Sequence, residues 1–118
     1  FVPLGALFTA VSILAPDVLS QAAALHVWTA GAIGLMTVAV MTRASLGHSG
    51  RKLHASGATT AAYVALIASV AARVLADVFP DLRMAFLDVS GLAWIVCFGL
   101  FLYAYGPMLA LAKKPDAA

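Results

Sequence analysis

The histidines of this chain are the side chains best suited to hold a cofactor or a metal ion. His26 and His48 stand at the two ends of an apolar stretch, so each places an imidazole at one rim of a predicted helix. At a rise of about 1.5 Å per residue they lie about 33 Å apart and cannot share an ion. His26 can coordinate haem iron or copper, or it is an interfacial histidine that is hydrogen-bonded to a neighbour.

A third histidine lies close to the second. His48 and His54 flank a turn that would let their rings approach each other. Arg51 and Lys52 lie between them, and two cations would repel a divalent metal ion. Local electrostatics therefore favours a basic interfacial loop over a metal site made by this pair.

Two methionines and an arginine lie between His26 and His48. Met36 and Met41 are about 140° apart around a helix, so they cannot chelate one copper ion together. Arg43 can extend its charge to the membrane surface, or it can pair with an anionic group such as a haem propionate.

Composition places these residues in a membrane protein. The chain has 118 residues, of which 64% are hydrophobic and only 10% are charged. This excludes an ordinary soluble domain, in which about half of the residues are apolar. The net charge of +2 then reports membrane topology and does not indicate a nucleic-acid partner.

Apolar runs predict an all-α, polytopic transmembrane helix bundle with short loops. Residues 22–41, 57–79 and 89–112 each reach the roughly 20 residues that cross a bilayer as a helix. Residues 2–15 form a shorter run, which we interpret as a partial helix. Residues 1–118 are expected to be one bundle, the C-terminal part of a larger membrane protein whose remaining helices are its partners, together with lipid.

Turn-forming residues separate the runs. Pro16 ends the first, and Asp17 or Ser20 is expected to cap the next helix. Residues 47–50, with two glycines, end the second run, and Pro80 ends the third. Asp88 is the predicted cap of the last helix.

Charge asymmetry predicts the orientation. Alternating helices put most cations on one side, which we expect to be cytoplasmic together with the C-terminus: Arg43, Arg51, Lys52, Lys113 and Lys114. The other side holds Asp17, Asp77, Asp81 and Asp88. Arg73 and Asp77, four residues apart, are expected to form an ion pair on that side.

Helical spacing predicts one face with candidate chemistry and one structural packing face. At 100° per residue one sector gathers His26, Thr37, Met41, Ala44 and His48. Small residues on the third run form a stripe that is expected to pack on the second helix through Ala30 and Gly34: Ala61, Ala65, Ala68, Ala72 and Ala76. Aromatic residues are expected to lie in interfacial belts, and they are Trp28, Trp94, Tyr63, Tyr103 and Tyr105. Cys97 is expected to be a buried small hydrophobe.

The second run also carries a resemblance. Its matching residues are Ala24-Leu25-His26, Gly31-Ala32-Ile33-Gly34 and the run from Met36 to Arg51, with the core Met41-Thr42-Arg43-Ala44-Ser45-Leu46-Gly47-His48. This pattern is similar to the signature of the NnrS family. The resemblance implies a polytopic protein of the bacterial inner membrane that contains haem and copper and serves nitric oxide metabolism or protection from nitrosative stress.

The resemblance also implies roles for single residues. His26, Arg43 and His48 match the signature and become the cofactor-binding candidates, with His26 and His48 as the metal ligands. Nitric oxide is the implied small-molecule partner, and no catalytic residue is assigned. The alternative function is a transporter or channel fragment whose histidines relay protons or ions.

Overall fold

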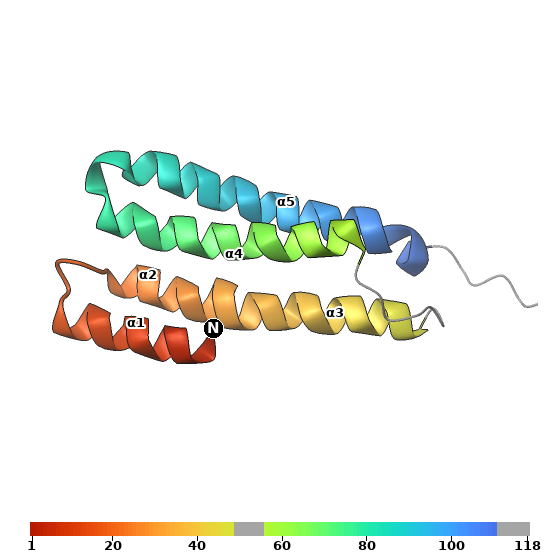
Figure 1. Ribbon diagram of the computed structural model, residues 1–118, viewed down its shortest axis with the longest axis horizontal. Helices are drawn as coiled ribbons and strands as arrows, with labels where there is room; N and C mark the ends of the chain where they lie inside the picture. The colour runs from red at the N-terminus through yellow and green to blue at the C-terminus, as the bar shows by residue number, and fades with distance from the viewer. Residues whose placement is uncertain (49–55, 111–118) are drawn as a thin grey trace, which may run out of the picture.

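The computed structural model describes residues 1–48 and 56–110, and nearly all of these residues are helical (Figure 1). In chain order the helices are α1 (Val2–Leu14), α2 (Gln21–His26), the π-helix η1 (Val27–Gly34), α3 (Leu35–His48), α4 (Gly57–Val78), the 3-10 turn η2 (Pro80–Leu82) and α5 (Arg83–Ala110). α2, η1 and α3 follow one another without a break and form one long helix.

Three helical segments are long and apolar enough to cross a membrane. They are Gln21–Gly47, Gly57–Val78 and Pro80–Ala110, and α1 is a shorter apolar helix beside them. The predicted all-α bundle with three spans and one short N-terminal helix is therefore confirmed.

Serine side chains cap the starts of α2 and α4. The Ser20 hydroxyl accepts a hydrogen bond from the Ala23 N–H at 3.1 Å and begins α2, as predicted. Ser56 caps α4 in the same way, through the N–H of Thr59. The prediction that Asp88 caps the last helix is wrong, because η2 leads directly into α5 and the helix has already begun at Arg83.

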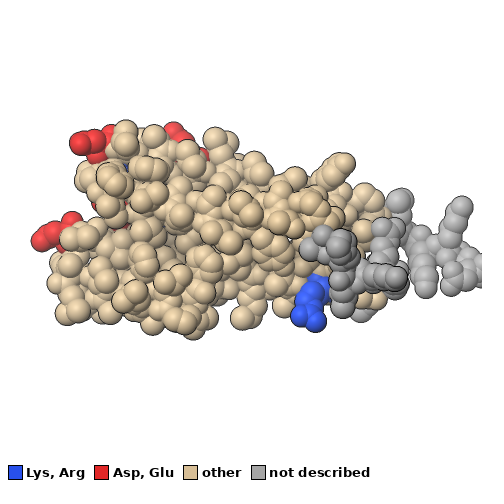
Figure 2. Space-filling view, viewed as in Figure 1, with Lys and Arg blue, Asp and Glu red and all other residues tan. Residues whose placement is uncertain are grey.

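The helices form two antiparallel hairpins that lie side by side (Figure 1). One pairs α1 with the long helix α2–η1–α3, and the other pairs α4 with α5. The turns within both hairpins lie at the same end of the molecule, where the exposed acidic side chains also gather (Figure 2). Arg51, Lys52, Lys113 and Lys114 lie outside the described residues, so the cytoplasmic orientation stays a prediction.

Two apolar clusters hold the hairpins together. Val38, Ala62, Leu66 and Cys97 form a buried cluster between α3, α4 and α5. Cys97 is fully buried, as predicted. A second cluster of Leu19, Ala23 and Ala24 lies near the turn end, with Phe8, Val11 and Val74 packed against it.

Close contact between α1 and η1 depends on glycine. A Cβ atom at Gly5 would lie 2.7 Å from the Trp28 ring, so only glycine leaves room for this indole. The Trp28 N–H donates to the Thr9 hydroxyl oxygen at 3.1 Å. Trp28 is therefore held between helices, and its place in an interfacial belt stays a prediction.

Two tyrosines at the opposite end pack against neighbouring helices. Tyr105 is buried and its hydroxyl is 2.8 Å from that of Thr59, while the Tyr63 hydroxyl is 3.2 Å from that of Thr42. Both rings face other helices because a hydroxyl partner is present there. Tyr103, at 78% exposure, is placed as a belt residue would be.

The predicted alanine stripe is only partly buried in this chain. Ala72 and Ala76 are buried, whereas Ala61 and Ala68 are exposed. Gly34 faces α4 as predicted, but its neighbour is a leucine: a Cβ at Gly34 would lie 3.6 Å from Leu66 Cδ2. The buried face of α4 is centred on Leu66, because α3 and α5 both pack against this leucine.

Candidate functional site

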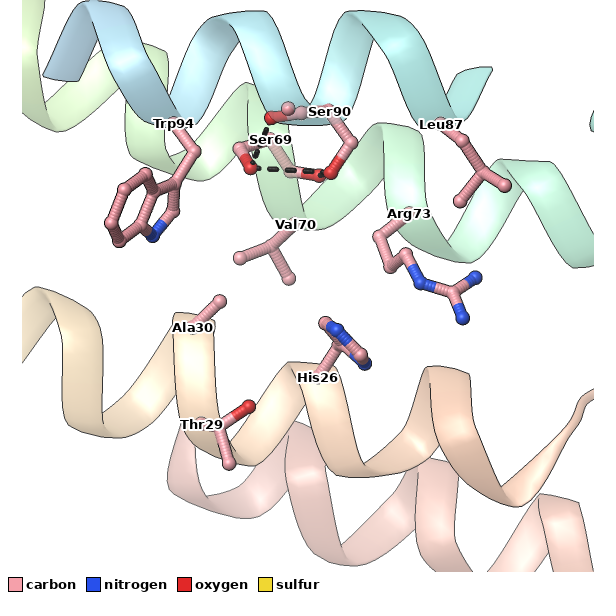
Figure 3. A pocket seen from close by; sticks show the side chains of 10 residues that line it. His26, Thr29, Ala30, Ser69, Val70, Arg73, Leu87, Ser90 and Trp94 are labelled. Atoms are coloured by element: carbon pink, nitrogen blue, oxygen red, sulfur yellow. Dashed lines mark hydrogen bonds between the residues drawn. The ribbon is translucent and has the colours of Figure 1, made fainter. Parts of the chain in front are cut away.

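A groove of about 500 Å³ lies between the two hairpins, close to the end that holds the turns (Figure 3). Its volume is in the range of small-molecule and cofactor sites. Residues from α2, η1, α4 and α5 line it: His26, Thr29, Ala30, Ser69, Val70, Arg73, Leu87, Ser90, Gly91 and Trp94. Of the three residues carried over from the family signature, only His26 belongs to this groove.

His26 is the last residue of α2, and its ring is exposed. Nδ1 lies 2.7 Å from the carbonyl oxygen of Ala22, one turn earlier. A carbonyl can only accept, so Nδ1 carries the proton and donates it. Nε2 is then the unprotonated nitrogen of the neutral ring, and it has no hydrogen-bond partner among the described residues.

This arrangement fits both interpretations of His26. A hydrogen bond to a neighbour is what an interfacial structural histidine would make. It is also what a ligating histidine makes, since metal-bound imidazoles generally donate the other ring N–H to a carbonyl or carboxylate. The groove beside the ring leaves room for a ligand at Nε2.

Arg73 enters the groove from α4, opposite His26 (Figure 3). Its Nη1 donates to Asp77 Oδ1 at 3.4 Å, which confirms the predicted ion pair. The other carboxylate oxygen of Asp77 accepts from both the backbone N–H and the hydroxyl of Ser20. One carboxylate thus joins the start of α2 to the arginine on α4.

The serine pair in this groove satisfies its own polar atoms. The Ser69 hydroxyl donates to the Ser90 carbonyl oxygen at 2.8 Å, and the Ser90 hydroxyl donates to the Ser69 carbonyl at the same distance. These bonds join α4 to α5 (Figure 3). The remaining lining of α4 and α5 includes the apolar side chains of Val70, Leu87 and Trp94.

Arg43 and His48 lie on α3, well away from His26. Seventeen residues of helix separate His26 from Arg43, about 25 Å at 1.5 Å per residue. Arg43 is exposed, and the side chain of His48 lies outside the described part, as does His54. The structure therefore does not bring the three signature residues together, and a role for His48 as a ligand stays a prediction.

The prediction that His26, Thr37 and Met41 share one face is wrong. His26 lines the groove between the hairpins, whereas Thr37 and Met41 line a separate apolar groove with Met36 and Trp28. η1 is the physical reason. Its wider i→i+5 turns rotate each residue by less than an α-helix does, so a wheel drawn at 100° per residue loses its phase across Val27–Gly34.

Metal-binding groups are sparse in the described part of the chain. Within residues 1–48 and 56–110, no three histidine, cysteine or acidic side chains gather closely enough to hold an ion. A metal at His26 would need its other ligands from the cofactor itself or from another polypeptide segment.

Sequence reasoning missed most of the groove. The spacing of Arg73 and Asp77 was visible, but nothing in it indicated that Arg73 faces His26. Ser69, Ser90 and Trp94 carry no motif, and a hydrophobic wheel of α4 or α5 does not reveal which residues meet the long helix. The pairing of helices distant in the sequence decides this.

Comparison with known proteins gives one family. A family model described as NnrS protein matches residues 1–113. No curated protein and no solved structure matches the chain. The family match covers the whole described part, so it includes the groove at His26 as well as the segment around Arg43.

Proposed function

Since this chain belongs to the NnrS family, we propose that it is part of a haem- and copper-binding membrane protein of the nitric oxide response, and that His26 would hold the haem iron. The membrane assignment rests on the three long apolar helices. The bacterial inner membrane as its location, with the C-terminus in the cytoplasm, is part of the same proposal.

One observation carries the role of His26. Its Nδ1–H is engaged by the Ala22 carbonyl, and the ring lines a groove of cofactor size. That hydrogen bond fixes the tautomer and the ring orientation, which leaves Nε2 as the coordinating atom. Apolar side chains on α4 and α5 suit the face of a porphyrin, and the paired serines add no unsatisfied polar group.

The residues of this chain would have distinct tasks. His26 binds and orients the cofactor, and Val70, Leu87 and Trp94 keep water from its face. Haem, when bound, supplies a redox-active iron whose properties depend on the axial ligand and on the polarity around it. Nitric oxide is the proposed small-molecule partner at that iron. Copper is proposed for the protein as a whole, with His48 as its candidate ligand in this chain.

The test compares the intact protein with His26→Ala, purified in detergent, for the Soret absorbance and for haem and copper per protein. We expect His26→Ala to lose more than about 90% of the haem, and added imidazole to restore part of the absorbance by filling the vacated position. His54→Ala is the matched control, because His54 lies outside the family signature.

Two results would contradict the proposal. Retention of wild-type haem by His26→Ala would reduce His26 to a structural residue. Absence of haem from the wild-type protein would favour the alternative, a transporter or channel in which histidines relay protons or ions.

A further inference from the structure

Arg73 and His26 reach the same groove from opposite hairpins. Arg73 extends from α4, and His26 extends from the end of α2 (Figure 3). The side chain of Arg73 is only 13% exposed, so its charge is partly removed from water. A cation in such a position requires a partner, and partly buried arginines in membrane helices are expected to serve a function.

Asp77 is an incomplete partner for this arginine. Its contact with Arg73 is 3.4 Å long, whereas a charge-assisted N–H···O bond is typically about 2.7–2.9 Å. The Oδ2 atom of Asp77 accepts two hydrogen bonds from Ser20, at the positive end of the α2 dipole. The negative charge of Asp77 is thus shared with a helix terminus, and most N–H donors of Arg73 have no partner among the described residues.

We propose that Arg73 binds a carboxylate of the cofactor that His26 coordinates. The inference rests on the proposed function and assigns the second anchor of that site. A planar, apolar ring that carries carboxylates fits the three kinds of surface in the groove. Its metal would meet His26, its face would meet Val70 and Trp94, and its carboxylate would meet the guanidinium, which can donate two parallel hydrogen bonds to it.

The position of Arg73 near the end of α4 supports a carboxylate of the cofactor as its partner. It lies about one turn from the end of α4, beside the turn end of the bundle where the acidic side chains are exposed (Figure 2). A propionate there would lie near the membrane surface while the ring extends toward the apolar interior. Arg43, the arginine indicated by the family signature, is about 25 Å from His26 along the helix and cannot fill this role.

The test measures binding of iron protoporphyrin IX and of its dimethyl ester to the haem-free intact protein in detergent. The ester keeps the iron and the ring but loses both carboxylates. We expect wild type to bind the free acid about ten-fold more tightly than the ester, the effect of a hydrogen-bonded charge pair. Arg73→Gln should bind both equally, and Arg73→Lys should keep part of the preference.

Arg83→Gln is the matched control, since Arg83 lies at the same end of the bundle but does not line the groove. It should keep the ten-fold preference. The inference is overturned if wild type binds acid and ester equally, or if Arg73→Gln still prefers the acid. Comparing the affinities of wild type for acid and ester needs no substitution. This comparison therefore decides the question even if Arg73→Gln folds poorly.

Failure of the proposed function would look different. If His26→Ala binds both porphyrins as tightly as wild type does, then His26 is not the ligand and the whole site is wrong. If His26→Ala loses both porphyrins and wild type does not discriminate between them, then only the role of Arg73 is wrong.

Discussion

At the end of the bundle that holds the two turns, an imidazole and a guanidinium face an open groove, whereas hydroxyl groups near the opposite end pair across helix interfaces. His26 and Arg73 keep donors or acceptors that no described residue satisfies. Thr59 and Tyr105, near the other end, share a buried hydrogen bond of 2.8 Å. The described residues leave no buried side-chain nitrogen or oxygen without a hydrogen-bond partner, so these free atoms of His26 and Arg73 are accessible from the groove. They are the atoms that we propose bind the cofactor.

The comparison also separates two uses of the same chemistry. Hydroxyl pairs such as Thr59 and Tyr105 stabilise a helix interface, while the groove presents an imidazole and a guanidinium across a cavity. The ion pair of Arg73 and Asp77 has both uses. It joins helices through Ser20 and places a cation beside the groove.

The largest effect is expected for Asp77→Ala. It leaves the partly buried Arg73 without its ion-pair partner and removes the acceptor for Ser20, so the free energy of unfolding should fall by about 2–3 kcal/mol. Thermal or denaturant unfolding in detergent measures the change. Asp77→Asn, which keeps an acceptor for Ser20, should lose less. Equal stability of Asp77→Ala and wild type would show that the turn end does not depend on this carboxylate.

Tyr105→Phe tests the paired end. It removes the partner of the buried Thr59 hydroxyl, which still contacts Ser56, so we expect a loss of about 1 kcal/mol in the free energy of unfolding. Tyr103→Phe is the control, because the Tyr103 ring is exposed. If the two variants unfold alike, the hydroxyl pair does not stabilise the bundle.

Ser90→Ala tests the pair of serines, Ser69 and Ser90, that lines the groove. Interhelical hydrogen bonds between small polar residues in membranes contribute on average about 0.6 kcal/mol. We expect a destabilisation of that size, together with unchanged haem absorbance, since the serines satisfy each other and are not assigned to the cofactor. Loss of haem from Ser90→Ala at full stability would assign the serine pair a role in binding.

Arg43→Gln is expected to have the smallest effect. Arg43 is exposed and distant from the groove, so the free energy of unfolding should change by less than about 0.5 kcal/mol. The haem spectrum at His26 should also stay unchanged. A shifted Soret band would mean that haem lies beside α3 and would contradict the division between the two ends.

The class of fold and much of the local structure follow from the amino-acid sequence. Apolar run length predicted three spans and one shorter helix, because crossing a bilayer demands a minimum length of apolar residues. The Ser20 cap and the ion pair of Arg73 with Asp77 were also predictable, since both are set by neighbours within one helical turn. The match to the family signature placed His26 among the candidates.

Which residues share the groove depends on how the helices pack against one another. The π-helix η1 changes the rotation of the long helix and separates His26 from Thr37 and Met41, an effect that a wheel of constant period does not contain. Packing of the two hairpins placed Arg73, and not Arg43, across from His26. Such a pairing depends on contacts between helices distant in sequence, where shape and close packing choose the partner and local spacing carries no information about it.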